Sequence, residues 1–196
     1  MKNILFTLGM ILSIVFTAFA QKQIPKVSSQ TYDLDIVKSN IAWKGSYLFQ
    51  FSEHTGIVNF KSGKLYTNKD EITGGSFVVD MTSITNEQYQ KNPDNGPVEH
   101  LKNADFFDVT VYPEAHLELS KVTYYQEDNE HRFEGRLTIK GITNTIMIRA
   151  FADAETRSIK TKFKIDRKDW GITYDSKYKD SAISDAIEFD VFLQFK

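Results

Sequence analysis

The sequence predicts an all-β protein, a single antiparallel β-barrel of about eight strands with one or two short helices in a central insertion. Short segments in which apolar and polar residues alternate are typical of half-buried strands. Turn-forming residues separate these segments at short intervals, and 196 residues suit one domain with a sizeable core. A β-sandwich is the other architecture with this pattern. Paired glycines, the long insertion and one-sided alternation favour the barrel, whose closure also removes exposed strand edges.

Residues 1–20 have the features of a secretory signal peptide. Lys2 is their only charge, an apolar run covers residues 4–19, and the segment ends in the small-x-small sequence Ala-Phe-Ala. A membrane anchor is the alternative, but the flank that should follow an anchor is missing. We therefore expect cleavage after Ala20 and a periplasmic or secreted protein.

The segment that follows, residues 21–30, is polar, contains Pro25, and is expected to be a flexible leader before a barrel domain at residues 31–196. The chain has no cysteine, which excludes disulfides and thiol catalysis. Its net charge of −2 makes nucleic acid an unsuitable partner. The 15 phenylalanines supply much flat apolar surface to bury.

The first half of the barrel is expected to contain strands centred on alternating apolar residues, at residues 32–36, 41–47, 54–60, 64–67 and 76–81. Trp43 is the largest side chain of the second strand. Ser62 and Gly63 are expected to form a tight turn. The pair Gly74-Gly75 predicts a bulge or bend that curls the sheet.

The central insertion begins at residues 82–97, which are rich in Asn, Asp, Pro and Gly and are expected to form a loop with one helical turn at residues 86–90. A plug segment follows at residues 98–113. Its first five residues are expected to form a short helix, which Asn and Asp residues then end. The adjacent Phe106 and Phe107 should point to opposite faces of an extended chain that continues to the next strand.

The second half is expected to contain strands at residues 116–125, 132–140, 144–151, 158–165 and 187–195, with a local turn at residues 166–171. The last strand has the clearest alternation: every second residue from Ile187 to Phe195 is apolar. Its apolar face should therefore point into the barrel.

Three ordered motifs resemble signatures of the YceI-like family: HLKNADFFD at residues 100–108 with Tyr112-Pro113, EGRLTIKGIT at residues 134–143, and DRKDWGI at residues 166–172. The resemblance covers residues 32–196. It implies a lipocalin-like barrel in an exported, non-catalytic protein that carries or sequesters a long isoprenoid-type lipid, such as a quinone or polyprenyl tail.

Under that reading, large apolar side chains would line the ligand site, and the lipid would be cargo rather than a cofactor. Each of them also has an ordinary interpretation as a core residue. A purely apolar tail needs almost no polar contact, so it leaves no short motif. The candidate ligand-binding residues are Trp43, Phe49, Phe77, Leu101, Phe106, Phe107, Phe133, Phe163, Phe189 and Leu193.

Nothing in the sequence predicts an enzyme. The four histidines, at positions 54, 100, 116 and 131, lack the spacing of metal ligands. His116 and Glu118 are the best histidine–carboxylate pair, because residues two apart on a strand share a face. No nucleophile-elbow motif occurs. Asp166 and Arg167 are expected to form a structural ion pair, and Trp170 to close the adjoining turn.

Two other functions stay open from the sequence. One is a binding module for a protein or an amphiphile, built on a barrel filled by its own side chains. A weaker one is a small enzyme that acts on an amphiphile. The lipid-carrier interpretation leaves room for transient membrane contact, and an unpaired strand edge would allow a dimer.

Overall fold

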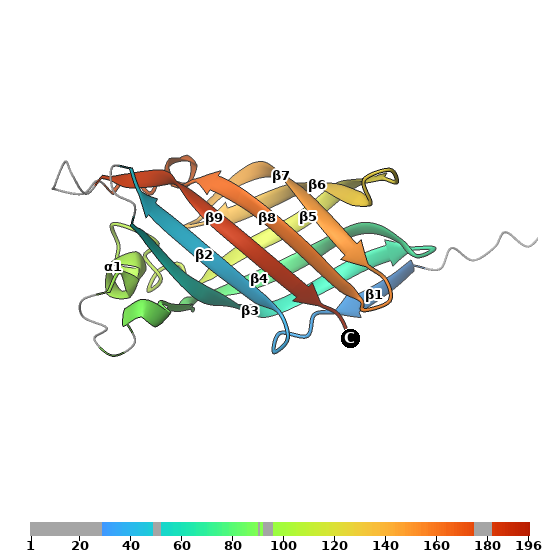
Figure 1. The fold of residues 1–196 in the computed structure, drawn as a ribbon, viewed down its shortest axis with the longest axis horizontal. Coiled ribbons are helices and arrows are strands. Elements are labelled where there is room, and N and C mark those ends of the chain that lie inside the picture. Colours follow the sequence, from blue (N-terminus) through green and yellow to red (C-terminus); the bar gives the residue numbers. More distant parts are fainter. Residues whose placement is uncertain (1–28, 49–51, 90, 92–95, 175–181) are drawn as a thin grey trace, which may run out of the picture.

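The structure is a computed structural model, and it describes residues 29–48, 52–89, 91, 96–174 and 182–196. Antiparallel strands dominate it (Figure 1). The strands are β1 (Ser29–Asp33), β2 (Asn40–Tyr47), β3 (Glu53–Asn68), β4 (Glu71–Thr85), β5 (Glu114–Tyr125), β6 (Glu130–Ile139), β7 (Ile142–Asp153), β8 (Ser158–Asp166) and β9 (Ile183–Gln194). The short helices are η1 (Glu87–Tyr89), α1 (Val98–Lys102) and η3 (Arg167–Trp170).

The sheet closes into an eight-strand barrel, which confirms the predicted fold class. Strands β2 to β9 follow the order β3-β2-β9-β8-β7-β6-β5-β4, and the pairing of β3 with β4 completes the circle. Strand β1 pairs with the second half of β3, beyond the point where β2 ends. One sheet face is therefore enclosed, and alternate side chains from every strand meet inside.

The expected turn at Ser62-Gly63 is wrong. β3 runs through both residues as one strand of 16 residues, and its pairing with β4 shifts register between Phe60 and Ser62. A Cβ at Gly63 would lie 2.7 Å from the Phe77 ring, so the glycine makes room for a core side chain rather than a turn. The register shift also changes which residues face inward, because one extra residue reverses the alternation.

The paired glycines of β4 lie where a bend was predicted. The pairing of β3 with β4 shifts register beside Gly74, which leaves Thr73 as an extra residue. A Cβ at Gly74 would lie 2.7 Å from the Leu119 carbonyl oxygen of β5, so the strands approach closely here. This bulge confirms the expected irregularity and bends the long β4 toward closure.

Some strand boundaries differ from those expected. β1 begins at Ser29, so the last two residues of the expected leader belong to a strand, and β1 ends at Asp33 rather than at residue 36. Ile36 is 44 % exposed and does not face the core. The signal peptide and the rest of the leader lie outside the described residues. Within the described part of the chain, no helix is long and apolar enough to cross a membrane.

The central insertion covers one end of the barrel, where α1 lies in Figure 1. η1 and α1 confirm the two short helical segments expected there. The extended run expected after them is wrong: the chain forms a compact turn, in which Phe107 N–H donates to the Leu101 carbonyl and Asp108 N–H to that of Asn103, at 3.0 and 2.8 Å. The Lys140 ammonium fixes the turn by donating to the carbonyls of residues 104 and 106.

This turn also contradicts the expectation that Phe106 and Phe107 face opposite ways. Both side chains are buried, and their ring centroids lie 4.9 Å apart in an edge-to-face arrangement. Alternation applies only to extended backbone, and the DFF sequence here lies in a turn. The plug segment therefore inserts two aromatic rings into the barrel end instead of one.

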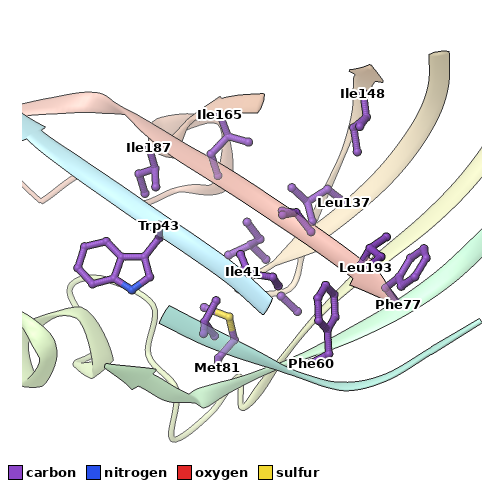
Figure 2. Close-up of a cluster of buried hydrophobic side chains, with 14 of the residues drawn as sticks. Ile41, Trp43, Phe60, Phe77, Met81, Leu137, Ile148, Ile165, Ile187 and Leu193 are labelled. Carbon is purple, nitrogen blue, oxygen red and sulfur yellow. The ribbon is translucent and has the colours of Figure 1, made fainter. Parts of the chain in front are cut away.

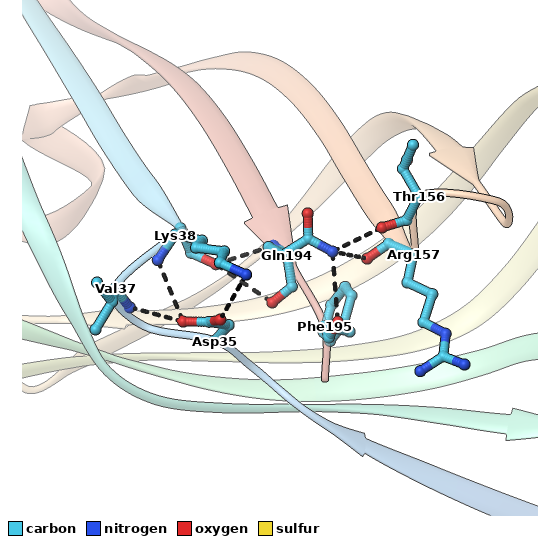
Figure 3. A network of polar contacts seen from close by, with 8 residues as sticks. Asp35, Val37, Lys38, Thr156, Arg157, Gln194 and Phe195 are labelled. Atoms are coloured by element: carbon cyan, nitrogen blue, oxygen red, sulfur yellow. Dashed lines mark hydrogen bonds and ion pairs between the residues drawn. The ribbon is translucent and has the colours of Figure 1, made fainter.

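A polar network ties together the opposite end of the barrel (Figure 3). The Gln194 side chain donates to the carbonyls of Thr156 and Arg157, and its backbone carbonyl accepts from Asp35 N–H at 2.8 Å. Buried Leu34 and Phe195 form a strand bridge beside it. These contacts join the segment after β1, the β7–β8 turn and the chain terminus.

Strands β7 and β8 pair only from Ala150 to Asp153, so the two strands separate toward the plug end. Helix η3 occupies this gap. Its Trp170 is 1 % exposed and donates from Nε1 to the Leu137 carbonyl at 3.1 Å, which agrees with the structural role expected for this ring.

The ion pair expected between Asp166 and Arg167 is wrong. Asp166 instead caps η3 by accepting from the Lys168 N–H at 2.9 Å. The buried guanidinium of Arg167 pairs with Asp185 of β9 at 2.8 Å.

Candidate ligand-binding cavity

The barrel encloses a cavity of about 530 Å³. This size falls in the range of small-molecule sites, about 300–1,000 Å³. The barrel therefore contains space that its own side chains do not fill. The alternative drawn from the sequence, a binding module on a filled barrel, required no such space. Figure 2 shows part of the wall, with Trp43 at one end of the cluster and Phe77 and Leu193 at the other.

The cavity is elongated. Its wall includes both Ile183 and Leu193, ten residues apart on β9, a distance of about 33 Å along a strand and about 25 Å along the axis of a barrel with strands tilted by about 40°. The shape suits a single chain better than a compact ring system.

Aliphatic and aromatic side chains form most of the wall. Nine of the ten candidate residues lie on it: Trp43, Phe77, Leu101, Phe106, Phe107, Phe133, Phe163, Phe189 and Leu193. Phe49 lies outside the described residues. The structure thus brings candidates from β2, β4, β6, β8, β9, α1 and the plug turn onto one surface. Whether they bind a ligand stays a prediction.

Strand register explains why several of these aromatic residues meet. Trp43 of β2 lies opposite Phe189 of β9, and Phe189 lies opposite Phe163 of β8. The last two rings have centroids 5.3 Å apart. Directly opposed residues share a face, so the three rings form a continuous row across three strands.

One end of the cavity carries polar groups that the sequence reasoning treated only as enzyme candidates. We call this end the cavity mouth; its wall contains Ser46, Tyr47, His54, Gly96, Pro97, His100 and Tyr174. Most of these residues are partly exposed, so the cavity reaches the surface here. The position of His54 could have been inferred, because it precedes Gly56, Val58 and Phe60 at intervals of two on the inward face of β3.

His54 is held in place by its neighbours. Its Nε2 lies 3.0 Å from the Tyr47 hydroxyl, and its ring is 5.7 Å from the Tyr89 ring of η1. Burial lowers the pKa of His54 because it disfavours the charged imidazolium, while nearby Gln88 acts weakly in the opposite direction. The imidazole is therefore neutral at pH 7, with a single N–H.

His100 lies on α1, across the mouth. Its ring centroid is 4.2 Å from that of Tyr174 and 5.9 Å from that of Phe106. The Asp105 carboxylate lies 3.7 Å from its Nδ1. The mouth thus combines flat aromatic surfaces with imidazole nitrogen atoms.

Arg167 also contributes to the cavity wall, although it is 1 % exposed. Its Nη1 donates to the Ile172 carbonyl at 2.7 Å, and its Nη2 pairs with Asp185. Because its charge is paired and its N–H groups donate to neighbouring segments, Arg167 stabilises the structure of the wall. This agrees with the structural role expected for it.

The catalytic candidates do not form a site. His116 and Glu118 lie on the outer face of β5, where His116 contacts Glu114 at 3.5 Å and Glu118 contacts Arg136 at 3.5 Å. Within the described residues, no three histidine or acidic side chains lie close enough to hold a metal ion. His131 lies between the Tyr124 and Phe133 rings of the barrel wall.

Comparisons with known proteins agree with this architecture. BcnA of Burkholderia cenocepacia superposes with a TM-score of 0.66 at 17 % identity, covering 82 % of this chain and 98 % of BcnA. The YCEI protein of Campylobacter jejuni gives 0.54 at 21 % identity, covering 75 % and 87 %. No curated protein sequence matches this chain. The model of the YceI-like domain matches residues 32–195, and the chain therefore belongs to the YceI-like family.

Proposed function

We propose that this protein is an exported, non-catalytic carrier that holds one long apolar lipid of the isoprenoid type inside its barrel. The observation that carries the proposal is the elongated cavity, whose wall is almost wholly apolar over the interior of the barrel. The family resemblance implies the same class of ligand. Export rests on the signal-peptide features of residues 1–20.

The energetics favour a chain-shaped lipid. Each buried methylene contributes about 0.8 kcal/mol, so a 20-carbon tail gains about 16 kcal/mol before the costs of ordering it. A wall that is mostly apolar gives this gain to any long apolar tail. Selection among such lipids must therefore come from length, from branching, or from the head group at the cavity mouth.

The plug segment lies where a lipid would enter and leave the cavity. It lies at the mouth end and places the edge-to-face rings of Phe106 and Phe107 on a turn held by the Lys140 side chain. A turn of this kind can open without disturbing the strand ladders, because its links to the barrel are side-chain contacts. Transient contact of this end with a membrane would give the lipid a path into the cavity.

Organic extraction of the protein purified from membrane-containing cells, followed by mass spectrometry, tests the proposal. We expect one apolar lipid in close to one-to-one ratio with the protein, and an intact mass that corresponds to a chain starting at Gln21. A matched preparation of the variant Ala150→Leu, which narrows the cavity, should retain much less lipid. Repeated extraction without any lipid, combined with failure to load isoprenoids added to the protein, would refute the carrier function.

A further inference from the structure

Two large apolar side chains of β7 lie on the outside of the barrel. Met147 is 64 % exposed and Phe151 is 51 % exposed. They alternate with Ile148 and Ala150, which are buried and lie on the cavity wall, so Arg149 points outward as well. Large apolar side chains that gather around an arginine, instead of occurring singly, indicate an interaction surface.

Strand register extends this surface to the neighbouring strands. Phe151 lies opposite Lys160 of β8, and Lys160 lies opposite Phe192 of β9. Arg149 lies opposite Arg132 of β6. Directly opposed residues share a face of the sheet, so these side chains form one patch. We call it the β7 face; it consists of Arg132, Met147, Arg149, Phe151, Lys160 and Phe192.

The β7 face carries positive charge that is not neutralised on the face itself. Arg149 and Lys160 form no ion pair with any residue in the described part of the chain. Arg132 pairs with Glu130, and its guanidinium lies 4.0 Å from the centre of the Tyr125 ring. Like charges directly opposite each other destabilise a sheet, and an acidic group from outside, placed between the two arginines, would remove this cost.

The acidic residues around the β7 face are already bound to other groups. Glu134, which lies opposite Met147, accepts from the Lys121 ammonium. Asp153 at the end of β7 accepts from the backbone N–H groups of Glu155 and Thr156. The whole chain has a net charge of −2, so its cationic character is confined to local surfaces such as this one. The face is therefore complementary to an acidic partner.

The position of the β7 face favours a protein over a membrane. β7 runs away from α1 toward the opposite end of the barrel (Figure 1), and Phe151 lies two residues before its end. A membrane bound here would lie against the barrel wall, far from the cavity mouth. Membrane-binding segments also insert apolar residues below the head groups, whereas Met147 and Phe151 stand on a regular strand beside charged side chains. Exposed Met, Phe and Arg together are typical of protein interfaces.

We propose that the β7 face binds a partner protein through an acidic surface that also presents apolar side chains. Carboxylates of the partner lie between Arg149 and Arg132 and beside Lys160, and its apolar groups cover Met147 and Phe151. The cavity mouth stays open in this complex, so the partner holds the carrier while a lipid enters or leaves. Docking itself does not depend on which ligand the barrel holds.

Photo-crosslinking in cells of the source organism tests the inference. The photoreactive residue p-benzoylphenylalanine replaces Met147 in the full chain. In the control it replaces Asn59, which is exposed on β3, four strands from β7 in either direction around the barrel. The captured protein is identified by mass spectrometry, purified, and titrated with the wild-type carrier, with Arg149→Glu, and with Lys64→Glu, a matched charge reversal on the outer face of β3.

We expect one partner protein to be captured from position 147 and not from position 59. Its affinity should fall with rising salt concentration, and by more than about tenfold with Arg149→Glu, because the reversal places like charges across the interface. Lys64→Glu should change the affinity by less than about twofold. The lipid retained after purification should be the same for both variants, because neither residue lies on the cavity wall.

Failure to capture a protein from position 147 would overturn the inference. So would a captured protein that binds wild type and Arg149→Glu equally well. Capture of a second copy of this chain would assign the face to self-association and would likewise count against the proposal, as would binding to phosphatidylglycerol vesicles that Arg149→Glu abolishes. The carrier function is tested separately by lipid extraction, and it would stand in each of these cases.

Discussion

A larger side chain on the cavity wall has different effects in a hollow barrel and in a tightly packed one, so it distinguishes between them. Ala150 of β7 is 2 % exposed and lies on the cavity wall, opposite Thr161 of β8 in the ladder. Replacing it by leucine adds three methylene-sized groups that point into the space a lipid tail would occupy. In a tightly packed core the same change would force neighbouring side chains apart.

The two situations predict effects of opposite sign. If the added groups enter an existing hollow, they bury apolar surface and stabilise the ligand-free protein by as much as about 2.4 kcal/mol. Overpacking of a filled core would instead destabilise it by about 1–3 kcal/mol. The lipid loses the equivalent of three methylene sites, so its affinity should fall by up to about 50-fold.

The measurement combines urea denaturation of delipidated protein with lipid retention after purification. Ala154→Leu in the exposed β7–β8 turn is the control, and it should change neither quantity. We expect Ala150→Leu to keep or raise the free energy of unfolding while lipid retention falls. A loss of more than about 1 kcal/mol with unchanged retention would refute the hollow-barrel reasoning.

Three further predictions concern the parts around the cavity. Trp170→Phe removes the donor to the Leu137 carbonyl in a fully buried site and should lower the free energy of unfolding by about 1–3 kcal/mol in urea, with unchanged preference among lipids. Lys140→Met releases the plug turn, so hydrogen exchange at residues 103–108 and the rate of lipid release should both increase; Lys162→Met, whose ion pair lies on the outer face, should leave both rates unchanged. Burial lowers the pKa of His54 and of His131 below their ordinary value of 6.5. The unfolded chain therefore binds protons first as the pH falls below about 6.5, and stability should fall with it. His54→Gln combined with His131→Gln should flatten urea midpoints measured between pH 7 and pH 5, and an unchanged slope would contradict the assignment.

Alternation along the chain predicted the fold well, because strand geometry is local. The last strand shows this: Ile187, Phe189, Val191 and Leu193 all face inward as expected. A period of two follows directly from the pleat, so one face of each strand can be read from the residues alone. The same rule placed six strand candidates on the cavity wall: Trp43, Phe77, Phe133, Phe163, Phe189 and Leu193.

The rule failed where the backbone departs from a regular strand. Ser62-Gly63 looked like a turn, yet it lies within a strand whose register shift brings Leu65 inside. Phe106 and Phe107 lie in a compact turn and are both buried. Arg167 binds Asp185, a residue 18 positions away, rather than its neighbour. Each outcome depends on a partner from another strand, which a local pattern does not contain.

The sequence by itself determined an all-β chain with an apolar inward face and two short helical turns. These properties depend on the alternation of apolar and polar residues and on the secondary-structure propensity of neighbouring residues. Only the tertiary structure decided that this face surrounds a hollow. Cavity volume is the difference between the space that closed strands enclose and the volume of the side chains inside it. The tertiary structure likewise decided that Trp43, His54 and His100 lie at the same end of the cavity. Closure of the barrel and packing of the insertion on its end bring β2, β3 and α1 together.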